Sequence, residues 1–274
     1  MQRLKKKLLL SGIGIHSGVE IQINISPGTP ETGIRFFRQG YENTPIPCDA
    51  RYALSAARAT LLEKDGRRIR TPEHLLSALY GLGITCADIT MSDEEVPILD
   101  GSAKTFTDAF IDAGIEALPC LAIPAITIPI SVQGPHGSTA SVFPDTLRRF
   151  TYLLHFPNSF VGYQYYSFVW TPEGYITEIA PARTFGFRHE VAALKAQGLA
   201  LGGSLDNAVI IGDDGYINTT LRFPDELVRH KVLDLIGDMA LVGTPFTGHV
   251  VGVASGHALH AHLAQEIQKQ IVIQ

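Results

Sequence analysis

The sequence contains few cysteines, and the ones it has are not arranged for disulfide bonding. Its 274 residues include only three, Cys48, Cys86 and Cys120, which are odd in number, widely spaced and form no C-x-x-C pair. Such cysteines are typical of reduced thiols rather than of a disulfide framework. We therefore expect them to act as packing residues in a protein of a reducing compartment.

An excess of positive charge and a long apolar run are also absent. The chain has 22 Lys and Arg against 27 Asp and Glu, a net charge of -5, and its one basic run lies within residues 3–7. That balance argues against a nucleic-acid partner. The apolar run within residues 1–10 is too short for a signal peptide or a membrane span. We expect a cytoplasmic monomer without stable membrane insertion, and leave peripheral membrane contact open.

Strand signals precede helix signals in the first half of the chain. Residues 19–25 alternate apolar and polar side chains, and residues 33–38 form a second strand-like segment. Two helices follow, at 73–80 and at 103–112. Thr71 is a suitable N-cap for the first of them, with Pro72 at the first helical position.

The second half repeats this order after a proline-punctuated stretch at 118–124, which we interpret as a domain boundary. Strands are expected at about 125–132, 138–143, 148–155, 163–169 and 249–253, and helices at about 188–197, 224–242 and 256–269. The pattern predicts an α+β protein of two similar units, residues 1–120 and 121–274, packed together.

One predicted helix carries ionisable residues at helical spacing. His230, Asp234 and Asp238 are successive i, i+4 positions, so their side chains share one helix face. The alternative without a functional role is that His230 and Asp234 form a solvent-exposed pair, which contributes a few tenths of a kcal/mol to helix stability. The surrounding residues are mostly apolar, however, and buried carboxylates need partners. A metal ion bound by His230 and Asp234 satisfies that need, which leaves Asp238 free to orient another group.

The missing third ligand is best sought at the start of the first helix. Glu73 and His74 are adjacent there, and adjacent residues point about 100° apart on a helix. His74 can therefore bind a metal while Glu73 addresses water, the division between ligand and general base in zinc hydrolases. Taken alone, Glu73 is equally consistent with a first-turn acid favoured by the helix dipole. The pairing with His230 and Asp234 favours the catalytic interpretation.

A second histidine cluster follows near the end of the chain. Ser255 is a suitable N-cap that places His257 in the first turn of the last helix, where Asp238 could balance its pKa for proton donation. For His260 and His262 we expect solvated positions on that helix. A second metal site built from these histidines is the weaker alternative.

Three other motifs lack the neighbouring residues or elements that their functions require. The glycine-rich segment 12–18 is followed by a strand, so no helix N-terminus is available to bind a dinucleotide pyrophosphate. His189-Glu190 lacks the second histidine of a zincin helix, and the chain has no G-x-S-x-G serine. We therefore reject Rossmann, thermolysin-like and serine-hydrolase interpretations.

Together the motifs resemble one family over nearly the whole chain, the zinc-dependent UDP-3-O-acyl-N-acetylglucosamine deacetylases of lipid A (lipopolysaccharide) biosynthesis. The resemblance rests on SGIGIHSG at 11–18, TPEHL at 71–75, EVPILDGSA at 95–103, ARTFGF at 182–187, LGGSLDNA at 201–208 and the segments around His230 and His257. It implies two similar domains, each a sheet with two helices, stacked as a β-α-α-β sandwich with the active site at their junction.

The resemblance also implies roles for individual residues. His74, His230 and Asp234 correspond to the Zn²⁺ ligands, and Glu73 to the general base. His257 corresponds to the general acid and oxyanion stabiliser, oriented by Asp238, and Thr184 to the threonine that assists at the oxyanion. Phe185 and Lys231 correspond to residues that contact the sugar and the nucleotide diphosphate, while the segment containing Gly202, Gly203 and Ser204 is expected to help line an apolar passage for the acyl chain.

The implied reaction is hydrolysis of the N-acetyl group of an acylated UDP-amino sugar, the committed step of lipid A biosynthesis. Two alternatives stay open beside it. A zinc amidohydrolase of this fold could act on another acylated amino sugar, because ligands fix the chemistry and pocket walls fix the substrate. A non-catalytic descendant would be expected to have lost Glu73 or a ligand, and all of these residues are present.

Overall fold

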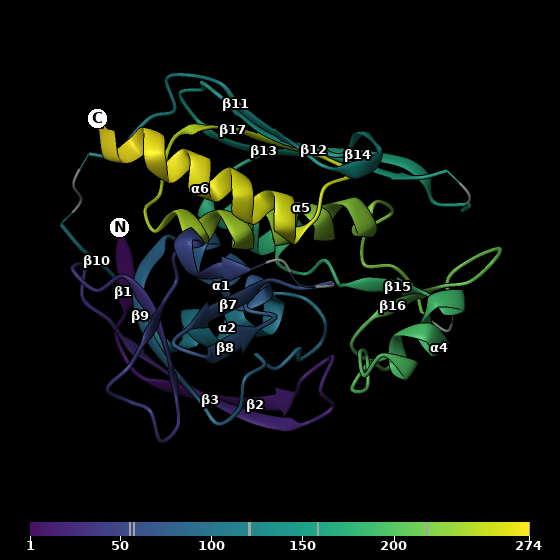
Figure 1. Ribbon diagram of the computed structural model, residues 1–274, viewed down its shortest axis with the longest axis horizontal. Helices are drawn as coiled ribbons and strands as arrows, with labels where there is room; N and C mark the ends of the chain where they lie inside the picture. Colours follow the sequence, from purple (N-terminus) through teal and green to yellow (C-terminus); the bar gives the residue numbers. More distant parts are fainter. Residues whose placement is uncertain (55, 57, 120–121, 158, 218, 274) are drawn as a thin grey trace.

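The protein is a layered sandwich of two sheets with helices between them (Figure 1). The computed structural model describes residues 1–54, 56, 58–119, 122–157, 159–217 and 219–273. From one side to the other, a five-stranded sheet, two long helices, two shorter helices and a seven-stranded sheet follow one another. This arrangement confirms the predicted α+β class.

The seven-stranded sheet is built from residues before 118. Its strands are β1 (Gln2–Leu4), β2 (Leu8–Ile13), β3 (Glu20–Pro27), β4 (Ile34–Arg38), β5 (Ile46–Pro47), β9 (Ile84–Met91) and β10 (Ile115–Ala117). Strand β9 is central: it pairs in parallel with β1 and β4 and antiparallel with β3. In β3 every second residue, Ile21, Ile23 and Ile25, is fully buried. The alternation turns one face of the sheet toward the helices.

The five-stranded sheet has the order β11-β12-β17-β13-β14. Its strands are β11 (Ile130–Gln133), β12 (Thr139–Phe143), β13 (Arg148–Phe156), β14 (Gly162–Val169) and β17 (Gly248–Val253). Strand β17 pairs in parallel with β13 and antiparallel with β12. Two parallel neighbours such as β13 and β17 cannot be joined by a tight hairpin. The chain that connects them must cross over, and this connection includes a helix.

Both halves use the same crossover. In the first half α1 (Glu73–Gly81) leads to β9 and then to α2 (Lys104–Ala113). In the second half α5 (Glu226–Met239) leads to β17 and then to α6 (His257–Ile273). The order expected from the sequence thus recurs with the same helix-strand-helix connection. The predicted division between residues 120 and 121 lies outside the described residues, and separate domains stay a prediction.

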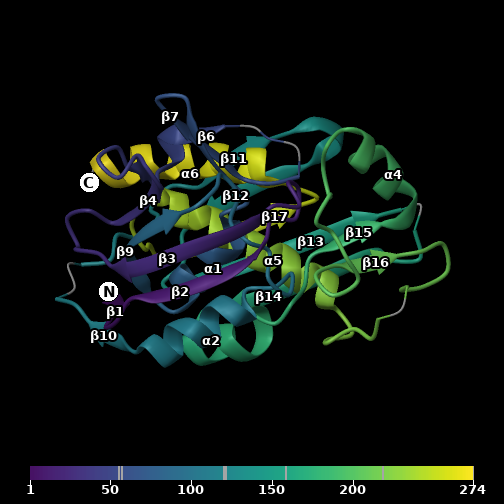
Figure 2. The same ribbon diagram turned by 90° about the horizontal axis from the view of Figure 1, so that it is seen from below.

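Some elements lie beside or between the main layers. Strands β15 (Phe185–Phe187) and β16 (Val209–Ile211) pair in parallel and lie with α4 (Arg188–Ala196) to one side of the sandwich (Figure 2). A small sheet of β6 (Ala53–Leu54), β7 (Leu61–Lys64) and β8 (Arg67–Arg70) precedes α1. Short turns of helix occur at α3 (Pro172–Gly174), Ala50–Tyr52, Pro135–Gly137, Tyr175–Ile179 and Ala240–Val242.

Two local predictions are wrong. The strand expected at 125–132 begins only at Ile130, after Pro124 and Pro129, because proline cannot donate to a strand ladder. Thr71 does not cap α1: its φ is +55° and its hydroxyl donates to Glu95 Oε1 at 3.2 Å, while Pro72 occupies the N-cap position without a side-chain cap. The other predicted strands and helices are confirmed within a few residues of their expected bounds.

Two expectations from composition concern the cysteines and membrane spans. Cys48 and Cys86 are free and buried, as expected of packing residues, while Cys120 lies outside the described residues. Within the described part of the chain, no helix has both the length and the apolar character that a membrane crossing requires.

The central helices α1 and α5 pack closely at Gly237. A Cβ added there would lie 2.1 Å from the carbonyl oxygen of Glu73. The aromatic ring of Tyr175 packs in the same way on Gly81, and its hydroxyl donates to Ser77 Oγ at 3.0 Å. The second half of the chain therefore meets α1 at two glycines, through the backbone of α5 at Gly237 and through an aromatic ring at Gly81.

We expect Gly237→Ala to force α1 and α5 apart. Alanine favours a helix interior by up to about 1 kcal/mol relative to glycine, but overpacking a close contact typically costs about 1–3 kcal/mol. The net effect should be a lower free energy of unfolding in denaturant titrations. Gly215→Ala, where an added Cβ meets nothing within 4 Å, serves as the control and should change stability by less than about 0.5 kcal/mol. Equal stability of the two variants would contradict the contact.

Candidate active site

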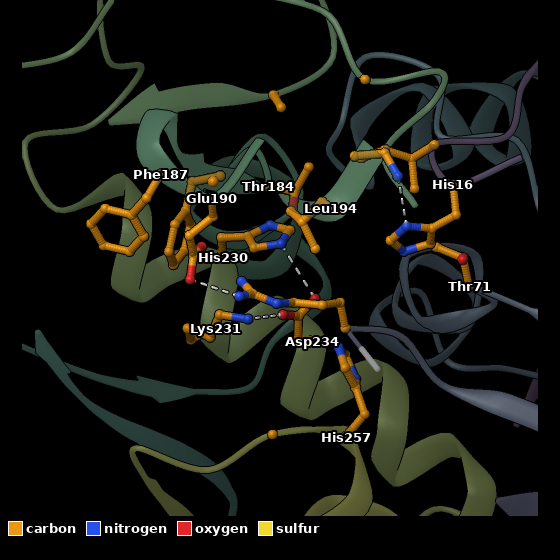
Figure 3. Close-up of a pocket in the computed structure, with 18 of the residues that line it drawn as sticks. His16, Thr71, Thr184, Phe187, Glu190, Leu194, His230, Lys231, Asp234 and His257 are labelled. Atoms are coloured by element: carbon orange, nitrogen blue, oxygen red, sulfur yellow. Dashed lines mark hydrogen bonds and ion pairs between the residues drawn. The ribbon is translucent and has the colours of Figure 1, made fainter. Parts of the chain in front are cut away.

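Three residues predicted as metal ligands, His74 of α1 and His230 and Asp234 of α5, bring their ligand atoms together. Figure 3 shows two of them, His230 and Asp234. Asp234 Oδ1 lies 3.5 Å from His74 Nε2 and 3.4 Å from His230 Nε2. Tetrahedral zinc sites have ligand distances near 2.0–2.1 Å, which places neighbouring ligand atoms about 3.3 Å apart. The observed separations fit one ion shared by the three side chains.

The protonation state of His230 suits a ligand. It is 1% exposed, and burial lowers its pKa to about 3, so the imidazole is neutral. Its Nδ1 donates to the carbonyl oxygen of Ala182 at 3.1 Å. With the proton held on Nδ1, the lone pair of Nε2 faces His74 and Asp234, an arrangement that metal-binding histidines commonly use.

Asp234 has one satisfied and one unsatisfied oxygen. Its Oδ2 accepts from Lys231 Nζ at 2.6 Å, whereas its buried Oδ1 has no hydrogen-bond partner among the described residues. Burial alone would raise the pKa of Asp234, but the neighbouring His230 and Lys231 hold it well below its usual range. A buried, ionised and unpartnered oxygen is costly. A divalent cation at this point would compensate it, so the residues present fit a metal.

Glu73 lies next to this cluster and is 2% exposed. Burial raises its pKa to about 7, although the facing His257 and His74 act in the opposite direction. Its Oε2 accepts from the backbone amide of Thr60 at 3.2 Å, and its Oε1 lies 3.6 Å from His257 Nε2. A carboxylate with a pKa near neutrality can take and release a proton under ordinary conditions.

His257 occupies the first turn of α6, as predicted, and faces Asp238. Its Nδ1 lies 2.8 Å from Asp238 Oδ2. Burial would lower the pKa of His257, but the carboxylates of Asp238 and Glu73 outweigh burial and raise it to about 10. The imidazole is therefore held as a proton donor with Nε2 directed at Glu73.

His260 corrects one prediction from the sequence. It is 1% exposed instead of solvated, and its Nδ1 lies 2.7 Å from Asp238 Oδ2. Its Nε2 lies 2.8 Å from Ser255 Oγ. The Ser255 hydroxyl, which was predicted to cap the N-terminus of this helix, therefore contacts the His260 ring. The expectation for His262 is confirmed, since 55% of its side chain is exposed.

The group of Asp238, His257 and His260 has the composition of a metal site. Both imidazoles approach the same carboxylate oxygen through Nδ1, which requires a proton on each of those nitrogens. The arrangement is therefore a hydrogen-bond network, and it does not favour the second metal site that the sequence left as an alternative.

Thr60 was missed entirely by the sequence analysis. It is 3% exposed and contacts both catalytic candidates: its amide donates to Glu73, and its hydroxyl donates to Asp238 Oδ1. It belongs to no recognisable motif, and 178 residues separate it from Asp238. No local pattern could have revealed it.

The glycine-rich turn at 14–17 binds a carboxylate of the protein itself. The amides of His16 and Ser17 each donate to Glu95 at 2.8 Å, and a Cβ on Gly14 would lie 2.3 Å from Glu95 Oε2. Strand β3 follows the turn, in agreement with the rejection of a dinucleotide site. Glu95 also accepts from Thr71, and so fixes the turn beside the start of α1.

The cluster opens into a cavity of about 1120 Å³. Thr184, Phe185 and Lys231 line it near the metal candidates, with the Phe185 ring 6.1 Å from that of His230 and Lys231 Nζ 5.5 Å from the Phe185 ring. Apolar side chains from the region of α4, β15 and β16 form another wall: Phe187, Val191, Ala192, Leu194, Leu205 and Ile210. The cavity thus has both polar and apolar walls, and Figure 3 shows residues of both kinds, such as Lys231 and Leu194, around it.

Gly202, Gly203 and Ser204, which were predicted to help line a passage for the acyl chain, have different surroundings. Gly203 and Ser204 line the cavity. Gly202 packs instead against the turn at 14–17: its amide donates to the carbonyl of Ile15 at 3.1 Å, and a Cβ there would lie 2.3 Å from the carbonyl oxygen of Gly14. Gly202 therefore joins the two halves at the rim of the cavity.

Comparison with known proteins gives a consistent result. The model of the family described as UDP-3-O-acyl N-acetylglycosamine deacetylase matches residues 1–269. The chain is 41% identical over 267 residues to the UDP-3-O-acyl-N-acetylglucosamine deacetylase of Chlamydia trachomatis serovar L2, covering 96% of this chain and 93% of the relative. The deacetylases of Leptospira biflexa and Nautilia profundicola are each 40% identical, over 98% and 97% of this chain and 89% and 91% of the relatives.

We expect the protein to bind one divalent metal ion that stabilises the fold. An ion that binds only the native state adds about 2.7 kcal/mol at a concentration one hundred times its Kd. Adding Zn²⁺ or Co²⁺ to chelator-treated protein should raise the midpoint of thermal unfolding, and His230→Ala or Asp234→Ala should abolish that rise. His262→Ala, on an exposed histidine, is the control. Unchanged metal affinity in both ligand variants would contradict the site.

Proposed function

The chain belongs to the UDP-3-O-acyl N-acetylglycosamine deacetylase family, and we propose that it removes the N-acetyl group of an acylated UDP-amino sugar at the site described above. The products are the free 2-amine and acetate. The substrate is UDP-3-O-[(3R)-3-hydroxyacyl]-N-acetylglucosamine, and the reaction is the committed step of lipid A biosynthesis. The cavity, with both polar and apolar walls, suits such an amphiphilic substrate.

The proposal rests on one observation: a candidate metal site, a candidate base and a candidate acid line the same cavity. His74, His230 and Asp234 offer a ligand set with one side open, Glu73 lies beside it as a base, and His257 faces Glu73 as an acid. Two histidines and a carboxylate with an open position are typical of a catalytic zinc, since structural zinc sites are closed by four protein ligands. We therefore assign Zn²⁺ as the cofactor.

In the first step Glu73 acts as general base. When bound, the metal supplies Lewis acidity that lowers the pKa of water and polarises a carbonyl. Glu73 takes one proton from the attacking water through its carboxylate, and the new C–O bond converts the acetamide carbonyl to a tetrahedral oxyanion. The Thr184 hydroxyl and the protonated His257 donate hydrogen bonds to that oxyanion.

In the second step His257 acts as general acid. It gives its Nε2 proton to the departing nitrogen as the C–N bond breaks, which releases the amine and acetate. Asp238 stays ionised throughout and holds Nδ1, so the imidazole presents Nε2 to the substrate. The proton taken by Glu73 returns to His257 Nε2, which lies 3.6 Å from Glu73 Oε1, and so restores both groups, while the acetic acid formed gives up its own proton to the amine or to solvent.

The remaining cavity residues position the substrate. Lys231 supplies a positive charge for the diphosphate, and Phe185 offers its ring to the sugar. The apolar wall that includes Leu194 and Leu205 receives the acyl chain, with Gly203 and Ser204 at its edge. We further propose a cytoplasmic monomer of two domains, whose contact with a membrane surface is at most peripheral.

Glu73→Gln tests the assigned base. The variant keeps the shape of the side chain but cannot accept a proton, so kcat should fall by about 10²- to 10⁴-fold while the metal content stays near that of the wild type. Deacetylation would be followed by mass spectrometry alongside elemental analysis, which also identifies the metal. Glu116→Gln, on the protein surface, is the control. Near-normal turnover by Glu73→Gln would contradict the assignment of Glu73 as the general base.

Acyl-chain dependence separates this substrate from other acylated amino sugars. Each methylene buried in an apolar passage contributes about 0.8 kcal/mol, so a 3-O-acyl chain shortened by two carbons should lower kcat/KM by about tenfold. Removing the UDP group should also lower it. Rates that are indifferent to both changes would point instead to an amidohydrolase with another acylated amino sugar as its substrate.

A further inference from the structure

The Asp238 carboxylate is fully buried and receives three side-chain donors, one from Thr60 before β7 and two from His257 and His260 of α6. Its Oδ2 lies 2.8 Å from His257 Nδ1 and 2.7 Å from His260 Nδ1, and its Oδ1 accepts the hydroxyl of Thr60. The catalytic candidate His257 thus supplies only one of the three contacts. The other two donors contact the orienting carboxylate, and the Thr60 hydroxyl oxygen also lies 3.2 Å from His257 Nδ1.

Thr60 connects the two catalytic groups across the halves of the molecule. Its amide donates to Glu73 Oε2 at 3.2 Å while its hydroxyl holds Asp238. Its carbonyl accepts from the amide of Thr71 at 3.0 Å, which fixes the Thr60 backbone beside the start of α1. One buried residue therefore sets the position of the base and of the carboxylate behind the acid.

His260 is itself held in one orientation. Its Nε2 lies 2.8 Å from Ser255 Oγ and its Nδ1 faces Asp238, so both ring nitrogens are occupied. When Ser255 donates to Nε2, the ring is neutral and carries its proton on Nδ1. Neither His260 nor Thr60 lines the cavity.

We propose that Thr60 and His260 are positioning residues of the deacetylation reaction, which lock the Asp238 carboxylate so that His257 presents Nε2 toward Glu73. The proposal rests on the proposed function. A carboxylate held by His257 alone could turn about its χ angles and carry the imidazole with it, whereas three donors, two from α6 and one from the residue before β7, leave one orientation. Misplacing a catalytic group even slightly is costly in rate.

Paired substitutions at Thr60 isolate its hydroxyl. Thr60→Val keeps the shape and the backbone amide but removes the hydroxyl, and Thr60→Ser restores it. Substitutions of residues that orient a site's functional groups commonly cost about 10- to 100-fold. We expect that loss in kcat for Thr60→Val, with KM within about twofold and metal content unchanged, and substantial recovery in Thr60→Ser. Equal kcat in the two variants would overturn the role of Thr60.

His260 allows the same design. His260→Leu removes the donor, whereas His260→Asn places an amide N–H near the position of Nδ1. The leucine variant should lose kcat and the asparagine variant should recover it, while His262→Leu, on the same helix and exposed, keeps wild-type activity. A merely structural role predicts instead that kcat follows thermal stability across all of these variants, and that result would overturn the proposal.

An Asp238→Ala background tests whether both residues act through Asp238. If they do, Thr60→Val and His260→Leu cost little further activity in that background, because residues that act as one unit are not additive. Full, additive losses would contradict the proposal. Failure of the wild type to deacetylate the acylated UDP-sugar would instead remove the proposed function itself.

Nuclear magnetic resonance of the imidazole nitrogens tests the geometry without any activity assay. In wild-type protein labelled with ¹⁵N, we expect His257 and His260 each to show a protonated, slowly exchanging Nδ1, and His260 an unprotonated Nε2. Thr60→Val should shift the Nδ1 signal of His257, and His262→Leu should leave it unchanged. A His260 ring protonated at Nε2 alone would contradict the network even if every variant at Thr60 failed to fold.

Discussion

Two buried carboxylates on one helix, Asp234 and Asp238, impose the constraint on which the rest of the site depends. Burying an ionised carboxylate costs several kcal/mol unless partners compensate it. Asp238 receives three donors of the protein, whereas Asp234 Oδ1 has no hydrogen-bond partner within the described part of the chain. The fold therefore satisfies one carboxylate completely and leaves the other to a cation. This difference separates the proposed orienting group, Asp238, from the proposed ligand, Asp234, although both lie on the same face of α5.

The partners of these carboxylates can arrive only because the two halves interlock. Each half crosses over through a helix, and these helices, α1 and α5, touch at Gly237 with no side chain between them. That contact brings Glu73 and His74 against residues of α5. Around it, Glu95 fixes the turn at 14–17, and Gly202 packs on the same turn from the second half. Neither half contains a complete site.

The sequence predicts those parts of the site that depend on local spacing. The i, i+4 positions of His230 and Asp234 on an apolar helix indicate buried ligands, and both side chains are buried. His260 was misjudged although a local signal existed, because residues 260, 263, 264 and 267 form one apolar helical stripe and all four are buried. A histidine on such a stripe is expected inside the protein. Thr71 was misjudged because its hydroxyl serves Glu95, 24 residues away, instead of the helix.

The sequence alone therefore determined most of the elements, the residue types of the proposed ligand set and, through its resemblance to a family, the reaction. These depend on periodicity and on motifs of a few residues, which act over one or two turns of chain. The tertiary structure decided which polar groups pair. Thr60 and Asp238 are 178 residues apart, and Glu95 lies 79 residues from the amide of His16 that it binds. Such pairs form because buried polar groups need hydrogen-bond partners. Which partners are available depends on how the sheets and helices pack together, and this is not encoded in any short segment.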